Sequence, residues 1–197
     1  MINHRTNRQQ QAEETKNRLI DSALKIFSNK GYKASTTKDI AKEAGVTDGL
    51  IYHYFKSKEE LIWAILERHT LIHHIQRMIA ELRPDMGIED TVGHYVRSLF
   101  RILEENNDLI VLIFGEAQRN TEIQTRLGMI VNHGARPLAG ILARYVNQDP
   151  EDLHLAVRNL QFSVVQYYLI IYRSQRDIQD RDRYLQVTSR QFVQMLK

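Results

Sequence analysis

Cysteine is absent from the 197 residues of this chain, and proline and glycine are scarce, with three and nine residues. A chain without cysteine forms neither disulfides nor thiolate metal sites, which favours a reducing, cytoplasmic location. The low proline and glycine content leaves room for long helices and argues against a loop-rich or disordered protein. The polar N-terminus lacks the apolar core of a secretory signal peptide.

Long hydrophobic runs are missing as well. The most apolar C-terminal stretch, residues 162–172, has about half of the roughly 20 residues that a membrane-spanning helix needs. The hydrophobic fraction of 43% is nevertheless enough for a packed core, and 26% charged residues is ordinary for a soluble protein. We therefore expect a soluble protein with no membrane partner.

Positive charge is concentrated in the N-terminal third of the chain. Residues 1–58 contain eleven Lys and Arg against six Asp and Glu, a net charge of +5 within a chain whose total is +3. The remaining residues therefore carry a net charge of −2. This asymmetry indicates a polyanionic partner at the N-terminal end, although a solvated surface with chance asymmetry would look the same.

Apolar residues recur at helical spacing along nearly the whole chain, and no strand-like alternation of useful length is present. The sequence therefore predicts an all-α fold of about nine helices. Pro137 should kink or divide one of them. The expected ranges are 13–30, 37–44, 47–55, 57–82, 89–105, a short helix ending near 119, 121–146, 150–173 and 180–195.

Several local signals mark the ends of these helices. Gly31 follows the first helix as a C-terminal glycine. Ser57 and Glu60 have the spacing of a capping box, which predicts a helix start. Asp149 followed by Pro150 and two acids predicts another start, because aspartate caps a helix and proline suits its first position.

A helix-turn-helix is the expected structure of residues 36–55. Two short helices meet at Gly45, where a tight turn needs a residue with positive φ. Their inward-facing residues are Ile40, Ala41, Ala44, Val46, Ile51 and Phe55. A turn of this kind also occurs in proteins that do not bind DNA, so the motif alone does not establish that function.

The run TTKDIAKEAGVTDGLIYHYFKSKEEL, with the preceding FSNKGYKAS, resembles the DNA-binding motif of the TetR family of one-component bacterial regulators. The close match covers about residues 13–73. The resemblance implies a flexible basic arm over residues 1–12, a helix-turn-helix domain over 13–73 with its motif at about 36–55, and an effector-binding and dimerisation domain over 74–197. It also implies no enzymatic activity and no cofactor.

Relatives of this type contact DNA from the start of the second helix, along the third helix and at the start of the fourth. Carried over by position, the DNA-binding residues are Thr36, Thr37, Lys38, Thr47, Asp48, Gly49, Leu50, Tyr52, His53, Tyr54 and Lys58. Gly49 removes a side chain where a recognition helix must approach base edges in the major groove. Asp48 is suited to accept from a cytosine amino group or to cap the helix, and we favour capping.

This chain departs from the commoner family pattern at one place. Many relatives end the recognition helix with aromatic-His-Phe, whereas the order here is His53, Tyr54, Phe55. The resemblance therefore leaves open which of His53 and Tyr54 contacts a base and which contacts a phosphate.

By analogy with the family, residues of about 150–196 form a homodimer interface, and a small, mainly hydrophobic effector binds among the helices of residues 60–172. Each candidate pocket residue is also suited to plain core packing. These candidates are Trp63, Leu66, Phe100, Leu103, Ile113, Phe114, Gln118, Met129, His133, Gln161, Val165 and Tyr168. His69 and His73 are four residues apart, but no carboxylate or cysteine completes a metal site with them, so no metal is expected.

The function that these residues favour is a ligand-responsive repressor, which binds a palindromic operator as a dimer and is released by its effector. A helical enzyme is not supported, because no phosphate loop, nucleophile motif or pair of acids at metal spacing is present. The motif alone does not exclude a DNA-binding activator or an architectural protein without a ligand.

Overall fold

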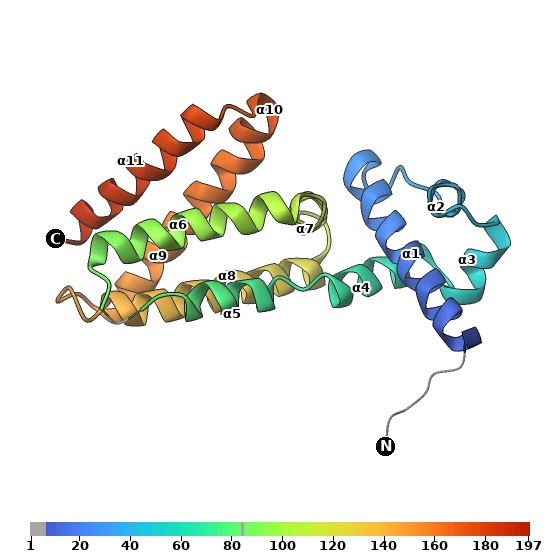
Figure 1. Ribbon diagram of the computed structural model, residues 1–197, viewed down its shortest axis with the longest axis horizontal. Coiled ribbons are helices and arrows are strands. Elements are labelled where there is room, and N and C mark those ends of the chain that lie inside the picture. The colour runs from blue at the N-terminus through green and yellow to red at the C-terminus, as the bar shows by residue number, and fades with distance from the viewer. Residues whose placement is uncertain (1–6, 84) are drawn as a thin grey trace, which may run out of the picture. The chain divides into compact units, whose positions relative to one another are not determined.

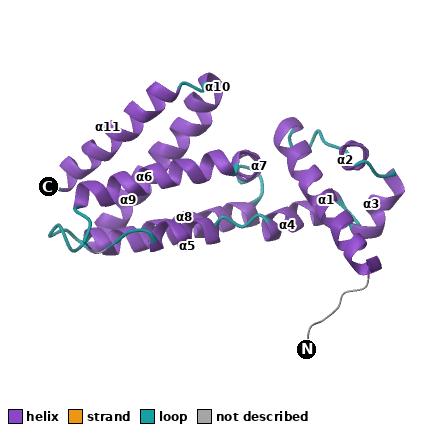
Figure 2. Cartoon of the chain, in the orientation of Figure 1, coloured by secondary structure: helices purple, strands orange, loops and turns teal. Residues whose placement is uncertain are grey.

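The structure, a computed structural model, describes residues 7–83 and 85–197, and these residues form only helices and connecting loops (Figures 1 and 2). The all-α prediction is thus confirmed. None of the described helices is long and apolar enough to cross a lipid bilayer. In chain order the elements are α1 (Asn7–Lys30), α2 (Thr37–Ala44), α3 (Asp48–Tyr54), α4 (Lys58–Arg68), α5 (Ile72–Ala80), α6 (Ile88–Glu105), α7 (Asn107–Glu116), α8 (Thr121–Leu142), α9 (Pro150–Gln166), the π-helix η1 (Tyr167–Tyr172), α10 (Arg173–Gln175) and α11 (Ile178–Leu196).

The chain divides into two compact units. The first holds the described residues up to Thr70 together with Asp108–Arg119, and the second holds Leu71–Asn107 and Asn120–Lys197. The expected domain boundary at residue 73 is therefore close to the first division point. The sequence pattern does not predict that residues 108–119 belong to the first unit.

The first unit is built around α1, which packs against α2 and α4, while α2 packs against α3 (Figure 1). Its short helices depend on this packing, because isolated helices of fewer than about 12 residues are marginal in water. The core comprises Leu19, Ile20, Ala23, Phe27, Ile40, Ala41, Ala44, Ile51, Phe55, Leu61, Ile62 and Ile65, all of them buried.

The second unit is a bundle in which α6 packs against α5, α9 and α11, and α8 packs against α5 and α9. Its largest fully buried side chains include Tyr95, Phe100, Leu138 and Leu142. The predicted helix start at Asp149 is confirmed, because the carboxylate accepts from the backbone N–H groups of Glu151 and Asp152.

The predicted single helix over residues 57–82 is wrong. Helix α4 ends at Arg68 and α5 begins at Ile72, with His69 in a non-helical conformation (φ −101°, ψ 50°). At the break, Asp21 of α1 lies 3.0 Å from His69 Nε2 and 3.3 Å from Arg68 Nε, so the end of α4 is tied to α1. The apolar periodicity of this segment does not reveal that the helix ends here.

Two smaller expectations also need correction. Residues 7–12 belong to helix α1, so this part of the expected flexible arm is helical, and residues 1–6 lie outside the described residues. Pro137 does not divide its helix, since α8 runs without interruption from Thr121 to Leu142. Four residues that were expected to extend this helix to 146 lie beyond its end.

A buried polar pair joins α6 to α9 in the second unit. The side-chain amide of Gln161 donates to the hydroxyl of Tyr95 at 2.6 Å, and both side chains are at least 95% buried. Burial raises the pKa of Tyr95, so its hydroxyl stays neutral. Gly134 of α8 faces this pair, because a Cβ placed there would come within 2.7 Å of Gln161 Nε2 and 3.3 Å of Tyr95 Oη.

Gly134→Ala should therefore destabilise the protein. The added methyl has to displace a buried amide that is held by a hydrogen bond, at a cost of about 1–3 kcal/mol. Gly140→Ala in the same helix is the matched control, since an added Cβ there meets nothing within 4 Å and alanine favours helix by up to about 1 kcal/mol. Denaturant unfolding of both variants measures the difference, and equal stabilities would contradict the steric argument.

Candidate nucleic-acid interface

The turn between α2 and α3 has the geometry that the sequence predicted. Gly45 has φ 66° and ψ 36°, the left-handed region that favours glycine. Its N–H donates to the carbonyl of Lys42 at 3.2 Å, and the N–H of Val46 donates to the carbonyl of Ala41 at 3.0 Å. These two bonds satisfy the carbonyls at the end of α2 and fix the direction in which the chain enters α3.

Helix α3 has one buried face and one exposed face. Ile51 is fully buried and Phe55, directly after the helix, is 5% exposed, so both belong to the core as expected. Tyr52 is 57% exposed, and His53 is exposed as well. Tyr54 is half-buried and its ring meets that of His53 edge-on, with 5.2 Å between the centroids. The four consecutive rings therefore do not form a single aromatic patch.

The start of α3 carries exposed residues and no side-chain cap. Thr47 occupies the N-cap position without a side-chain hydrogen bond, and Asp48 is the first residue of the helix. The expectation that Asp48 caps the helix is therefore wrong. Gly49 is exposed and an added Cβ would meet nothing within 4 Å, so the protein itself does not require glycine there. Leu50 is half-buried.

The start of α2 is held by a reciprocal capping box. The hydroxyl of Thr36 accepts from the N–H of Asp39 at 3.1 Å, and the carboxylate of Asp39 accepts from the N–H and the hydroxyl of Thr36 at 3.0 and 2.8 Å. Lys30 of α1 donates to the same carboxylate at 2.7 Å. The hydrogen bond from Lys30, followed by those from Thr36, lowers the pKa of Asp39 to about 2. The donors of Thr36, predicted to meet phosphate, are therefore occupied within the protein.

A side-chain hydrogen bond connects the two helices of the motif. The hydroxyl groups of Thr37 and Tyr52 lie 2.9 Å apart, and either one can act as the donor. Both residues are on the predicted list of DNA contacts, and the structure brings them together across the exposed side of the motif. Lys38, the next residue on α2, is exposed.

Lys58 at the start of α4 closes the loop between α1 and α2. Its ammonium donates to the backbone carbonyls of Tyr32 and Ser35, the second at 2.8 Å, and lies 4.5 Å from the centroid of the Tyr32 ring. A weaker contact of 3.5 Å reaches the carbonyl of Lys33. An ammonium group has three donors. The partners that the structure gives to Lys58 therefore compete with the predicted phosphate contact.

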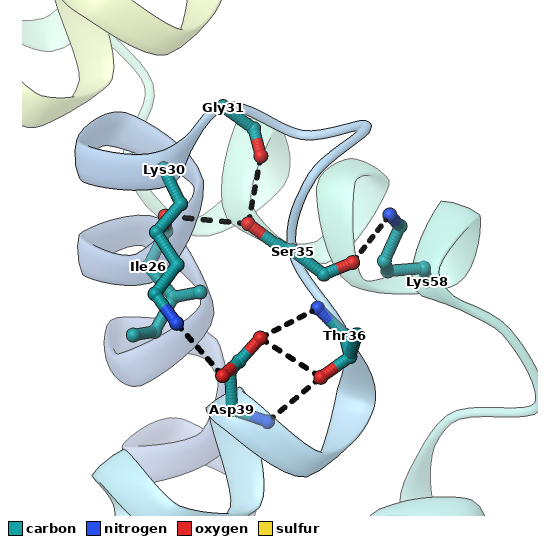
Figure 3. A network of polar contacts seen from close by, with 7 residues as sticks. All are labelled: Ile26, Lys30, Gly31, Ser35, Thr36, Asp39 and Lys58. Atoms are coloured by element: carbon teal, nitrogen blue, oxygen red, sulfur yellow. Dashed lines mark hydrogen bonds and ion pairs between the residues drawn. The ribbon is translucent and has the colours of Figure 1, made fainter.

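Figure 3 shows that two sets of hydrogen bonds hold the loop between α1 and α2. One is the bond from Lys58 to Ser35, which we call the Lys58 clamp, and the other is the capping box of Thr36 and Asp39. The hydroxyl of Ser35 donates to the carbonyl of Gly31 at 2.7 Å, while its own carbonyl accepts from Lys58. Asp39 and Ser35 were not among the predicted site residues. The Thr36-to-Asp39 spacing is that of a capping box and is the signal that could have identified the first of them.

The twelve candidate effector residues are divided between the two units. Trp63, Leu66, Ile113, Phe114 and Gln118 belong to the first unit, and the other seven belong to the second. Within the second unit Phe100, Leu103, Gln161, Val165 and Tyr168 are buried, whereas Met129 is 58% exposed and His133 is exposed. The structure thus brings five of the twelve into one core.

Comparisons with known proteins agree with this geometry. Residues 19–65 match the family model described as "Bacterial regulatory proteins, tetR family". The chain is 33% identical over 142 residues to the uncharacterized HTH-type transcriptional regulator YhgD of Bacillus subtilis (strain 168), covering 71% of this chain and 69% of that protein. It is 29% identical over 125 residues to the fatty acid metabolism regulator protein of the same organism, covering 63% of this chain and 64% of the relative.

The similarity extends to solved structures. The fold superposes with a TM-score of 0.63 on the transcriptional regulator FadR from Bacillus subtilis in complex with stearoyl-CoA, with 24% identity, covering 91% of this chain and 96% of that one. The fatty acid metabolism regulator is matched over slightly less than two thirds of its length. YhgD is matched beyond two thirds at 33% identity, and the family model covers the helix-turn-helix described above. The chain belongs to the TetR family of bacterial transcriptional regulators.

Proposed function

We propose that this protein is a ligand-responsive repressor that binds operator DNA as a homodimer. The observation that carries the proposal is the two-sided structure of α3. Ile51 is buried and anchors the helix to the core, while Gly49, Tyr52 and His53 form its exposed face. A short helix anchored in this way, behind a glycine turn, is suited to enter the major groove. The glycine turn and the hydrogen bond between Thr37 and Tyr52 fix the angle between the two helices.

Within this interface the residues have different roles. Thr47, Gly49, Leu50 and His53 would approach base edges, because they lie at the start or on the exposed side of α3. Lys38 would contact phosphate, since its ammonium has no ion-pair or hydrogen-bond partner among the described residues and DNA affinity depends on such cations.

Thr36 and Lys58 have a different role in this proposal. Their donors are engaged by Asp39 and by the carbonyls of the loop between α1 and α2. We assign them the task of holding that loop and the start of α2 in place for DNA. The backbone of α2 is then presented in one conformation, which reduces the entropy lost on binding.

Dimerisation through α9 and α11 is supported by large apolar side chains that the single chain leaves exposed. Leu155 is 51% exposed and Phe162 is 40% exposed, both on α9. Ile170 of η1, Ile178 and Met195 are exposed by 58–66%. Exposed apolar groups on two neighbouring helices are typical of a protein–protein interface. A two-fold dimer would match a palindromic operator with half-sites about 34–36 Å apart.

The effector is proposed to bind in the second unit, whose core is apolar with a few buried polar atoms. Thr91 Oγ1, Asn132 Oδ1 and Gln161 Oε1 are buried and have no hydrogen-bond partner within the part of the chain that the structure describes. A mainly hydrophobic ligand with a polar group fits this chemistry. The resemblance to a fatty acid metabolism regulator favours a lipid-derived compound of the acyl class over an aromatic one.

Gly49→Ala tests the DNA-binding face directly. We expect this variant to unfold at an equal or higher temperature, because alanine favours helix by up to about 1 kcal/mol and the methyl group has free space in the protein. Operator affinity should fall about tenfold or more, since the methyl occupies the space that a base edge needs. Operator DNA is first selected from genomic fragments, and its affinity for each variant is then measured by fluorescence anisotropy at fixed salt.

The control for this experiment is Gly128→Ala in α8, where an added Cβ also meets nothing within 4 Å. It should bind operator DNA as the unmodified protein does. Unchanged affinity of Gly49→Ala would remove α3 from the DNA contact.

Lys58→Ala tests whether Lys58 holds the loop between α1 and α2 or contacts a DNA phosphate. We expect a loss of about 1–2 kcal/mol in the free energy of unfolding, because two loop carbonyls lose a charged donor. The slope of log affinity against log salt should stay unchanged. Lys38→Ala should show the opposite pattern, with unchanged stability and a slope reduced by about 0.9 for each protomer, or about 1.8 for the dimer. A reduced slope for Lys58→Ala would restore this residue to the phosphate contacts.

Phe162→Glu tests the dimer. A carboxylate at this exposed position of α9 should prevent two apolar faces from meeting, so the variant should sediment as a monomer where the unmodified protein is a dimer. Operator affinity should fall with it. Met129→Glu, a substitution at an exposed methionine of α8, should remain dimeric. A dimeric Phe162→Glu variant would exclude this face of α9 from the interface.

A further inference from the structure

A second feature of the second unit is a groove between α6 and α11, with a volume of about 340 Å³. The two helices pack against each other. Its walls include Gly93 and Arg97 from α6, and Gln186, Arg190 and Gln194 from α11. This volume is within the range of small-molecule sites, at the lower end.

The groove has an excess of positive charge. Glu89 and Lys197, which also line it, form an ion pair at 2.8 Å and neutralise each other. Arg97 and Arg190 have no carboxylate partner among residues 7–83 and 85–197. Two guanidinium groups from different helices therefore border the same groove with their charge uncompensated by the protein.

The position of Arg97 depends on the glycine one helical turn before it. A Cβ at Gly93 would lie 3.1 Å from one terminal guanidinium nitrogen of Arg97, so this side chain lies back along α6 over the glycine. This direction is the one that long helical side chains normally take. The absence of a side chain at Gly93, which is itself a groove residue, lets the guanidinium lie against the α6 wall.

Neutral polar groups complete the lining. The amides of Gln186 and Gln194 offer both donors and acceptors. Ser189 donates its hydroxyl to the carbonyl of Leu185 at 2.7 Å, which leaves the hydroxyl oxygen as an acceptor. Val193 adds one apolar surface. Two guanidinium forks suit a phosphate dianion, and the amides and the hydroxyl suit a hydroxylated body.

We propose that the groove between α6 and α11 binds a small phosphorylated metabolite, such as a sugar phosphate or a nucleoside monophosphate, through Arg97 and Arg190. This site shares no residue with the DNA-binding face or the twelve candidate effector residues, whereas its α11 residues fall within the range expected for the dimer interface. A ligand here would connect α6 to α11 through one anion. The proposal therefore stands independently of the proposed operator and effector.

Isothermal titration calorimetry on the full chain, without DNA, tests the site. The probes are glucose 6-phosphate and adenosine monophosphate, with inorganic phosphate as the bare anion and with glucose and adenosine as the neutral counterparts. We expect saturable binding of at least one phosphate compound, with one site per chain, and none of glucose or adenosine. Preference for an organic phosphate supports the metabolite, whereas tighter binding of inorganic phosphate limits the ligand to the free anion and overturns the role of the amides.

Four variants assign the binding to the groove. Arg97→Gln and Arg190→Gln should each weaken binding about tenfold or more, because each removes a charge-assisted hydrogen-bond donor. The controls are Arg101→Gln on α6 and Arg183→Gln on α11, exposed arginines that do not line the groove, and both should bind as the unmodified protein does. Absence of saturable binding by any phosphate probe at millimolar concentration would overturn the proposal. So would equal weakening in all four variants, which would indicate a general effect of net charge.

Discussion

Burial of Ile51 and Phe55 is the interaction on which the candidate DNA interface depends. Helix α3 has only seven residues, too few to be stable by itself. Full burial of one such side chain is worth about 1.5–3 kcal/mol, so these two contacts offset a substantial part of the cost of ordering the helix, which is about 1–2 kcal/mol per residue. Because both point into the first unit, the residues on the opposite side of the helix face outward. The exposed positions of Tyr52 and His53 are therefore a consequence of core packing.

The loop between α1 and α2 is held by groups that could otherwise have met DNA. Lys58 donates to carbonyls of the loop, and Thr36 exchanges hydrogen bonds with Asp39, which is also paired with Lys30. These contacts lower the number of cations and hydroxyls that are free for phosphate. In return they fix the start of α2, since a carboxylate with a pKa of about 2 stays ionised at any physiological pH. Lys58 and Thr36 therefore order the loop and the start of α2, and their donors are less available for direct contacts with DNA.

Local signals made most of the fold predictable from the sequence. Gly45, Gly31 and the Asp149-Pro150 pair act within one turn of chain, and the structure has the expected helix ends at each of them. The break after Arg68 could not be predicted in this way, because the helical spacing of apolar residues continues across it and the contact there with Asp21 joins residues 47 positions apart. The partners of Lys58 lie 23–26 residues away along the chain, so local signals do not predict them either. The groove arginines come from two helices that are distant in sequence.

Buried polar atoms distinguish the two units. All five buried side-chain nitrogen and oxygen atoms that lack a partner in the described chain belong to the second unit, at Thr91, Asn132, His154, Arg158 and Gln161. Each unsatisfied buried group costs about 1–3 kcal/mol. A ligand or water molecules that supply the missing hydrogen bonds would recover part of that cost, and the recovered energy is available to shift a conformational equilibrium. The described residues of the first unit contain no such buried side-chain atom, which suits this unit to hold one shape, whereas the second unit is suited to respond.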